Sequence, residues 1–191
     1  MDDLELNLSI KQFKKSGDSV YFEKIYHHFL PKIYRFIFFQ VLNKQTAEDL
    51  TSEVFMKIYN NIRGSNLNSF TFKAWAFKIA HNTVIDYFRR ESKSKNDVSF
   101  EQYVEEYNER EIKDKNLIKE EKYLANELLL ESEKLMILLN RLPQDQKKIV
   151  LLRYVDELDY KTIGSILNKK ESAVRTMSFR ALKYIKEEIK K

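Results

Sequence analysis

Turn-forming residues are scarce along this chain, which holds only 3 Gly and 2 Pro among its 191 residues. A sandwich or barrel of β-strands needs such residues at nearly every hairpin, so their scarcity argues against an all-β protein. Hydrophobic residues make up 43% of the chain and aromatic residues 13%, which is enough to fill packed cores. We therefore expect an all-α protein with one large domain or two small ones.

Apolar residues recur at spacings of three and four in the first half of the chain, as is typical of amphipathic helices. One such stripe, between residues 20 and 42, comprises Phe22, Ile25, Tyr26, Phe29, Ile33, Tyr34 and Ile37. A second stripe comprises Ala47, Leu50, Val54, Phe55 and Ile58. Thr46 is its expected N-cap, with Glu48 and Asp49 in the first turn. A polar stretch at 60–69 predicts a loop, and residues 70–90 predict a third helix.

The second half of the chain begins with a charged linker and ends in short helices. Residues 91–131 have poor periodicity, and we expect a linker there that is helical at 118–130. A leucine-rich stripe then precedes Pro143, a residue that suits the start of the next helix. Two short helices are expected at 160–167 and 171–189.

Charge is unevenly distributed along the chain, whose formal net charge is +5. Residues 1–90 carry 13 Lys and Arg against 9 Asp and Glu, and residues 134–191 carry 14 against 7. Residues 91–133, in contrast, carry 7 against 13. Basic segments favour polyanions through counterion release, whereas an acidic connector is unsuited to lying on DNA. Ordinary solvated helix faces are the alternative explanation.

The chain contains no cysteine, which excludes disulfides, thiolate zinc sites and a cysteine nucleophile and fits a reducing cytoplasm. Its acidic beginning is unlike a signal peptide. No apolar run approaches the roughly 20 residues needed to span a bilayer. We therefore expect a cytoplasmic protein without membrane insertion.

Catalysis is the least supported class of function. The best metal site would combine Glu48, Asp49 and Glu53 with a histidine, but the histidines lie on different segments and lack H-x-x-x-H spacing. The chain also has no Gly-rich phosphate loop. We expect no enzymatic activity, no cofactor and no metal site.

The segment YKTIGSILNKKESAVRTMSFRALKYI has the spacing of a helix-turn-helix. Gly164 lies where the two helices would cross, and Asn168 tolerates the left-handed backbone of a tight turn. The residues expected to face the core are Ile163, Leu167, Val174 and Met177. The residues expected to face DNA are Lys169, Lys170, Glu171, Ser172, Arg175, Thr176 and Arg180. A plain helical hairpin with a charged face is the alternative.

The segment FKAWAFKIAHNTVIDYFRR mixes aromatic residues with Lys and Arg. Aromatic side chains beside cations are a means of holding unstacked single-stranded bases. The alternative is that these aromatic residues fill the core.

Taken together, these segments resemble the extracytoplasmic-function, or group IV, sigma factors of the sigma-70 family. The resemblance rests on AEDLTSEVFMKIY, WAFKIAHNTVIDYFRR, a charged linker, and LPQDQKKIVLLRYVDELDYKTIGSIL followed by SAVRTMSFRALKYI. It implies a non-enzymatic protein that binds core RNA polymerase and directs promoter recognition, strand opening and transcription initiation. The implied partners are the clamp helices of the largest polymerase subunit, the polymerase flap, duplex and single-stranded promoter DNA, and an anti-sigma factor.

The resemblance also implies a division of the chain. Residues 1–20 form an N-terminal extension, 21–92 sigma region 2, 93–133 a flexible acidic linker, and 134–191 sigma region 4 with the helix-turn-helix. The fold is thus expected to be two small helical domains joined by a flexible charged linker.

Particular residues take roles in this scheme. The implied polymerase-binding residues are Asp49, Leu50, Glu53, Val54 and Phe55. The implied residues for the −10 promoter element are Arg63, Asn66, Trp75, Lys78, Asn82, Asp86, Arg89 and Arg90, and the loop 61–69 would capture a flipped base. The implied residues for the −35 element are Lys169, Lys170, Ser172, Arg175, Thr176 and Arg180.

A helix-turn-helix regulator that binds DNA without polymerase is the competing class. It predicts tight sequence-specific binding by the protein alone and a palindromic DNA site. The docking motif around Asp49 and the polar helix that ends at Arg90 argue against it.

Overall fold

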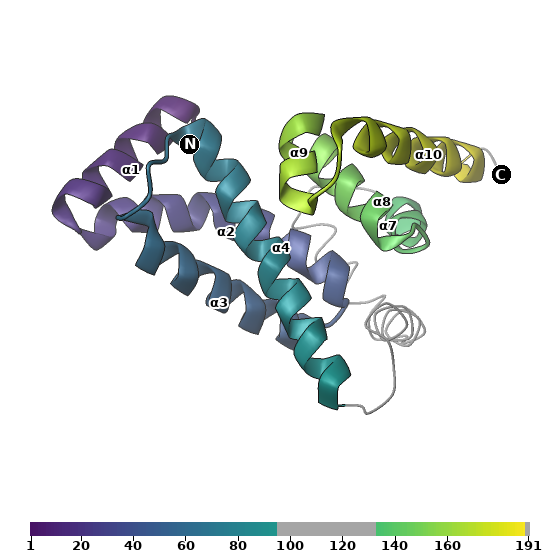
Figure 1. Cartoon of the computed structure of the whole chain (residues 1–191), viewed down its shortest axis with the longest axis horizontal. Helices are drawn as coiled ribbons and strands as arrows, with labels where there is room; N and C mark the ends of the chain where they lie inside the picture. Colours follow the sequence, from purple (N-terminus) through teal and green to yellow (C-terminus); the bar gives the residue numbers. More distant parts are fainter. Residues whose placement is uncertain (95–132, 190–191) are drawn as a thin grey trace.

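The computed structural model describes residues 1–94 and 133–189, and every regular element within these two ranges is helical (Figure 1). This confirms the predicted all-α class. The predicted linker, apart from its two ends, and its expected helix at 118–130 lie outside the described residues. The elements are α1 (Asp3–Ser16), α2 (Ser19–Val41), α3 (Lys44–Ile62), α4 (Ser69–Ser94), α7 (Glu133–Asn140), α8 (Gln144–Val150), η1 (Leu151–Val155), α9 (Tyr160–Leu167) and α10 (Glu171–Ile189).

Helices α1 to α4 form the first bundle, with α2 as its central helix. The predicted stripe of α2 supplies core residues such as Ile25, Phe29 and Ile33. From residue 35 to 42 every residue is buried, because both sides of this end of α2 are covered. A helix whose whole circumference is buried no longer needs a polar face, which accounts for the run of aromatic residues there.

Two details of the first bundle differ from the prediction. Asn43, and not Thr46, is the N-cap of α3, and its Oδ1 accepts a hydrogen bond of 2.9 Å from the Thr46 N–H. Asn is among the strongest N-cap residues, and it precedes Thr46 by the three residues that this bond requires. At its other end α3 continues to Ile62, so the loop before α4 is shorter than expected.

Helices α7 to α10 form the second bundle. Pro143 directly precedes α8, as predicted. The chain then widens into the single π-turn η1, where the Asp156 N–H donates to the Leu151 carbonyl at 3.1 Å. Glu157 follows with a left-handed φ of 58°. This turn ends the helix and directs the Asp156 side chain away from solvent.

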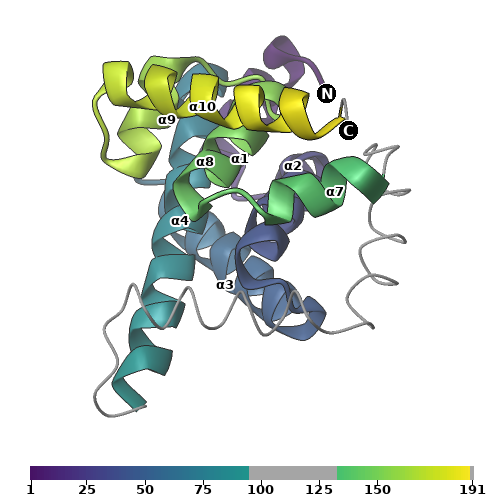
Figure 2. The ribbon, with the colours of Figure 1, turned by 90° about the vertical axis from the view of Figure 1, so that its right-hand side faces the viewer.

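The two bundles pack directly on each other (Figures 1 and 2). Phe39 of α2 lies in the core of the second bundle, in contact with a cluster that includes Leu142 and Leu151. Arg35 of α2 forms an ion pair of 2.8 Å with Asp156, and the two side chains are 8% and 0% exposed. Within the described ranges the two bundles therefore share a continuous interior.

Within residues 1–94 and 133–189, none of the helices has both the length and the apolar composition that a membrane span requires.

Candidate nucleic-acid interface

Helices α9 and α10 have the geometry of a helix-turn-helix. Asp159 caps α9 by accepting hydrogen bonds from the Thr162 N–H at 2.8 Å and from the Thr162 hydroxyl at 2.9 Å. These bonds, the backbone one foremost, hold the pKa of Asp159 below its usual value. At the other end Asn168 adopts the left-handed conformation, with φ of 54° and ψ of 43°. The turn prediction for Asn168 is thus confirmed.

Gly164 lies at the closest approach between α9 and the turn into α10. A Cβ atom at this position would lie 2.6 Å from the Lys169 carbonyl oxygen, which is a backbone atom and cannot rotate away. The Gly164 carbonyl also accepts the Lys169 N–H at 2.8 Å. The expected core residues lie beside it, with Ile163, Leu167 and Val174 buried and Met177 partly buried.

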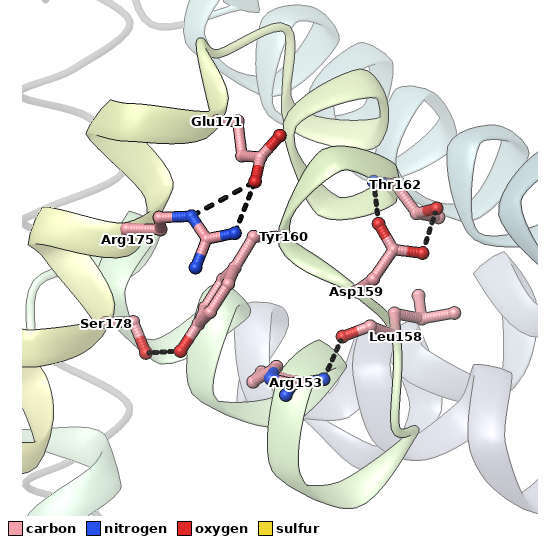
Figure 3. A network of polar contacts seen from close by, with 8 residues as sticks. All are labelled: Arg153, Leu158, Asp159, Tyr160, Thr162, Glu171, Arg175 and Ser178. Carbon is pink, nitrogen blue, oxygen red and sulfur yellow. Dashed lines mark hydrogen bonds and ion pairs between the residues drawn. The ribbon is translucent and has the colours of Figure 1, made fainter.

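A polar network joins the N-terminal end of α9 to the exposed face of α10 (Figure 3). The Tyr160 ring lies between two guanidinium groups, with the Arg153 Cζ 4.9 Å and the Arg175 Cζ 4.7 Å from its centroid. Glu171 accepts hydrogen bonds from Arg175 at 2.6 and 3.0 Å. Stacking and charge pairing together fix the orientation of Arg175 before any DNA is bound.

The predicted −35 residues lie around the N-terminal half of α10. Lys170, Ser172, Arg175, Thr176 and Arg180 are exposed. Lys169 is half-buried and pairs with Asp145 of α8 at 2.8 Å. The structure therefore brings these six residues to one end of the second bundle.

The predicted −10 residues on α4 follow its outer surface toward its C-terminal end. Asn82, Arg89 and Arg90 are exposed. Asp86 is half-buried and pairs with Arg89 at 3.4 Å. Trp75 is half-buried too, and its ring contacts that of Phe72 at a centroid distance of 5.8 Å.

The remaining −10 candidates, Arg63 and Asn66, lie in the short segment between α3 and α4. Both side chains are exposed. The Arg63 guanidinium lies over Gly17, the residue that ends α1.

Lys78 differs from the other −10 candidates because it faces the second bundle. Its ammonium donates to the carbonyls of Ser165 and Ile166 at 2.9 and 2.8 Å, and to Asn168 Oδ1 at 2.6 Å. These carbonyls belong to the last turn of α9, where backbone acceptors lack helical partners and a cation is favourable. Burial lowers the pKa of Lys78. In this arrangement the acceptors of the Lys78 ammonium belong to the second bundle of the same chain.

His81, one turn further along α4, is buried at the same contact between the bundles. Burial foremost, and then the nearby Lys148 and Lys78, lower its pKa from 6.5 to about 4. Asp145 acts in the opposite direction, and Lys169 adds to the lowering. The folded protein therefore holds His81 neutral over a range in which an unfolded chain would protonate it.

This difference predicts a loss of stability in acid. As pH falls through 6.5 the unfolded chain binds a proton that the folded chain refuses, so at pH 5 His81 should cost roughly 2 kcal/mol of unfolding free energy. We expect His81→Leu to lack this loss in urea unfolding at pH 7 and pH 5. Burial lowers the pKa of His28 to about 4 and raises that of Asp156 to about 6, but both groups are present in the two proteins, so their difference isolates His81. An equal acid loss in the two proteins would contradict the assignment.

The predicted polymerase-binding residues divide into two sets on α3. Asp49 is exposed and Glu53 is half-buried, whereas Leu50, Val54 and Phe55 are buried in the first bundle. Glu53 pairs with Lys57 at 2.7 Å and with Arg90 of α4 at 3.7 Å. The acidic face of α3 thus adjoins the basic end of α4.

Sequence reasoning missed Tyr160, Arg153 and Asp145, which position the −35 candidates. Arg153 lies in the π-turn and meets Tyr160 at the start of the next helix, and Asp145 meets Lys169 from another helix, so no local spacing signals either contact. Within the ranges that the structure describes, no three His, Asp or Glu side chains gather as a metal site would require.

Known proteins share this arrangement. The family model for Sigma-70 region 2 matches residues 25–94, and the model for Sigma-70, region 4 matches residues 132–185. A solved structure of the sigma factor RpoE from Bartonella quintana has the same fold, with a TM-score of 0.57, 18% identity, and coverage of 88% of this chain and 96% of that chain.

Two curated relatives are similar over most of this chain. The ECF RNA polymerase sigma factor BldN of Streptomyces coelicolor is 30% identical over 88% of this chain, which spans 60% of that longer protein. The ECF RNA polymerase sigma factor SigW of Bacillus subtilis is 28% identical over 95% of both chains. With both family regions in order on two packed helical bundles, this chain belongs to the extracytoplasmic-function sigma factors of the sigma-70 family, non-enzymatic subunits that direct RNA polymerase to promoters for transcription initiation.

Proposed function

We propose that this sigma factor recognises its promoters through two separate DNA surfaces, one on each helical bundle. Residues 21–92 act as region 2, which binds core polymerase and the −10 element, and residues 134–191 act as region 4, which binds the −35 element. Residues 1–20 and 93–133 are the N-terminal extension and the linker. Each surface alone binds weakly, and holding both on one polymerase raises the effective concentration of the second.

The proposal rests on one observation about the −35 surface: α10 has a buried face and, opposite it, an exposed polar face. Val174, Ser178, Ala181 and Ile185 are buried at helical spacing. Ser172, Thr176 and Arg180, four residues apart, are exposed away from them. A recognition helix needs this combination of a core face and a free polar face to enter the major groove. Lys169 and Lys170 would approach the phosphates, and Arg175 the edges of the bases.

The −10 surface combines the segment after α3 with the outer face of α4. Arg89 and Arg90 are suited to phosphate contacts, and Asn82 and Asp86 to polar contacts with an opened strand. Arg63 and Asn66 flank the position for a flipped base. Contacts with that base must offset the free energy spent on unstacking it. Trp75, partly packed on Phe72, supports the helix and offers an aromatic surface. No nucleotide hydrolysis is required.

The acidic face of α3 is proposed to bind the polymerase. Asp49 and Glu53 would contact the clamp helices directly, because both are accessible. Leu50, Val54 and Phe55 would act indirectly, since burial lets them hold α3 in place. The polymerase flap would bind the second bundle.

Lys78 sets a condition on this mechanism. Its ammonium has three acceptors at the end of α9, so a contact between Lys78 and the −10 element requires the two bundles to separate. We propose that promoter binding on the polymerase separates them.

Regulation by an anti-sigma factor and a cytoplasmic location complete the proposal. The Bartonella quintana relative was crystallised in complex with the anti-sigma factor NepR. A comparable partner of this chain would have to cover the polymerase-binding or the DNA-binding face.

Run-off transcription with core polymerase on fragments of the source genome tests the whole scheme. Defined transcripts that depend on this protein are expected. Their promoters should share two short elements at a fixed spacing. Transcripts from a single palindromic element, or DNA binding of equal strength without polymerase, would favour the stand-alone regulator instead.

A single charge removal tests the −35 surface. Arg180→Ala should lower transcription from such promoters roughly tenfold, since one lost DNA contact costs about 1–3 kcal/mol. Lys186→Ala removes the same charge from an exposed position near the end of α10 and should have little effect. Equal losses for the two variants would indicate general electrostatics and contradict the assignment of Arg180.

A further inference from the structure

Helix α1 is bound to the segment that connects α3 to α4. The Asn7 side chain makes two hydrogen bonds with Ser69: its Oδ1 accepts the Ser69 N–H at 2.6 Å, and its Nδ2 donates to the Ser69 hydroxyl at 3.0 Å. The Lys14 ammonium donates to the Ser65 carbonyl. Two side chains of α1, two helical turns apart, thus hold both ends of the stretch 65–69.

The end of α1 contacts the same segment further back. Gly17 closes α1 in the left-handed conformation, with φ of 73°, and the Arg63 guanidinium lies against its bare Cα. Beneath this contact Phe13 packs on Tyr59 and Phe22, with ring centroids 5.3 and 5.4 Å apart. The aromatic cluster fixes the end of α3 from which Arg63 projects.

These contacts satisfy backbone groups that the segment cannot satisfy alone. Ser69 is the first residue of α4, and the first N–H groups of a helix have no acceptor within it. Asn68 caps the Thr71 N–H at 2.9 Å, but the Ser69 N–H is satisfied by Asn7. The Ser65 carbonyl, in the irregular stretch before α4, is likewise satisfied by Lys14.

The two recognition candidates of this segment stand differently to these fixed points. The Asn66 side chain is exposed between the anchored Ser65 and Ser69, and the Arg63 side chain is exposed apart from its contact with Gly17. A short segment fixed at both ends, with the exposed Asn66 side chain between them, needs little further ordering when it binds a ligand.

We propose that α1 is a positioning element for −10 recognition, with Asn7 and Lys14 as positioning residues. They hold residues 65–69, and with them Asn66, in the conformation that receives a flipped base. This inference rests on the proposed role of Arg63 and Asn66, and it gives the N-terminal extension a part in promoter specificity without any contact between α1 and DNA. Without either positioning residue the segment would have to be ordered when the base binds, and discrimination among bases would fall.

Two neighbouring lysines provide a matched test in the holoenzyme. Lys14→Ala removes the bond to Ser65, and Lys15→Ala removes the same charge from the next, exposed residue. The probe is a promoter fragment identified by run-off transcription, together with versions in which single −10 bases are replaced. The readouts are the ratio of transcript from parent and replaced promoters, and permanganate reactivity of unpaired thymines.

Lys14→Ala should reduce discrimination among −10 bases about tenfold, as expected for one lost hydrogen bond to a charged group, while Lys15→Ala retains it. Asn7→Leu should act like Lys14→Ala. Asn7→Asp keeps an acceptor for the Ser69 N–H, adds a negative charge at a helix N-terminus, and should restore discrimination. A purely structural defect would lower transcription from all promoters equally and leave their ratio unchanged.

Asn66→Ala separates the two ways in which the inference can fail. If Asn66→Ala changes base discrimination but Lys14→Ala and Asn7→Leu do not, the positioning role of α1 is wrong. If Asn66→Ala and Arg63→Ala leave discrimination unchanged, the segment is no recognition surface, and the −10 assignment fails together with the inference.

Discussion

Replacing Gly164 with valine should abolish transcription from promoters that depend on a −35 element. Any Cβ at this position lies 2.6 Å from the Lys169 carbonyl oxygen, and the added methyl groups of valine increase the overlap. Relief requires α9 to move away from the start of α10, which shifts Lys169 and Lys170 relative to the groove. Overpacking of this kind costs about 3 kcal/mol, and run-off transcription together with urea unfolding measures both consequences.

Ser165→Ala is the matched control for this substitution. Ser165 is the next residue of α9 and is exposed, and its interaction with Lys78 uses the backbone carbonyl, which alanine retains. The control should therefore match the parent protein in both measurements. If Gly164→Val matched it as well, the close crossing would have no role in positioning the recognition helix.

The helices that sequence predicted best are those with one buried face. The apolar stripe from Phe22 to Ile33 became the one buried face of the first part of α2, and Ile163 and Leu167 became the buried side of α9. A half-buried helix repeats its apolar residues at helical spacing, so its orientation is encoded locally. Asn168 was predictable for a related reason, because few residues tolerate a left-handed turn.

Contacts between distant segments left no such local signal. Phe39 continues an aromatic run in which every residue is buried, so spacing alone does not show that it enters the second bundle. Asn7 and Ser69 are polar residues of ordinary appearance that meet across 62 positions. The packing of α4 on α9, and with it the binding of Lys78 by carbonyls, depends equally on tertiary structure.

The candidate site shows the same division. Exposure of Ser172, Thr176 and Arg180 follows from the periodicity of α10. The orientation of Arg175 does not, because Tyr160 contributes to it from another helix. Residue types at helical spacing therefore predicted which side chains face outward. The orientation in which those side chains are held could be seen only in the folded structure.

Removing the charge of Arg35 should have the largest effect on the contact between the bundles. Arg35→Met leaves the wholly buried Asp156 carboxylate without its cation, and breaking a buried pair in this way costs about 3–5 kcal/mol. Burial foremost already raises the pKa of Asp156 to about 6, and Arg35 opposes that rise. Without Arg35 the pKa should rise further, so protonation near pH 5 should relieve much of the penalty.

The pH dependence distinguishes this mechanism from a simple loss of packing. A carboxyl whose pKa is raised by folding costs stability as pH rises from its unfolded pKa to its folded pKa. A further rise of the Asp156 pKa should therefore make the stability deficit of Arg35→Met large at pH 7.5 and small at pH 5. Lys24→Met, an exposed position on the same helix, loses the same charge and should show no deficit at either pH. Urea unfolding measures the deficit, and fluorescent labels on α3 and α10 report separation of the bundles. A deficit that stays equal at both pH values would show that the Arg35 side chain acts by filling space, and that the charge of Asp156 does not hold the bundles together.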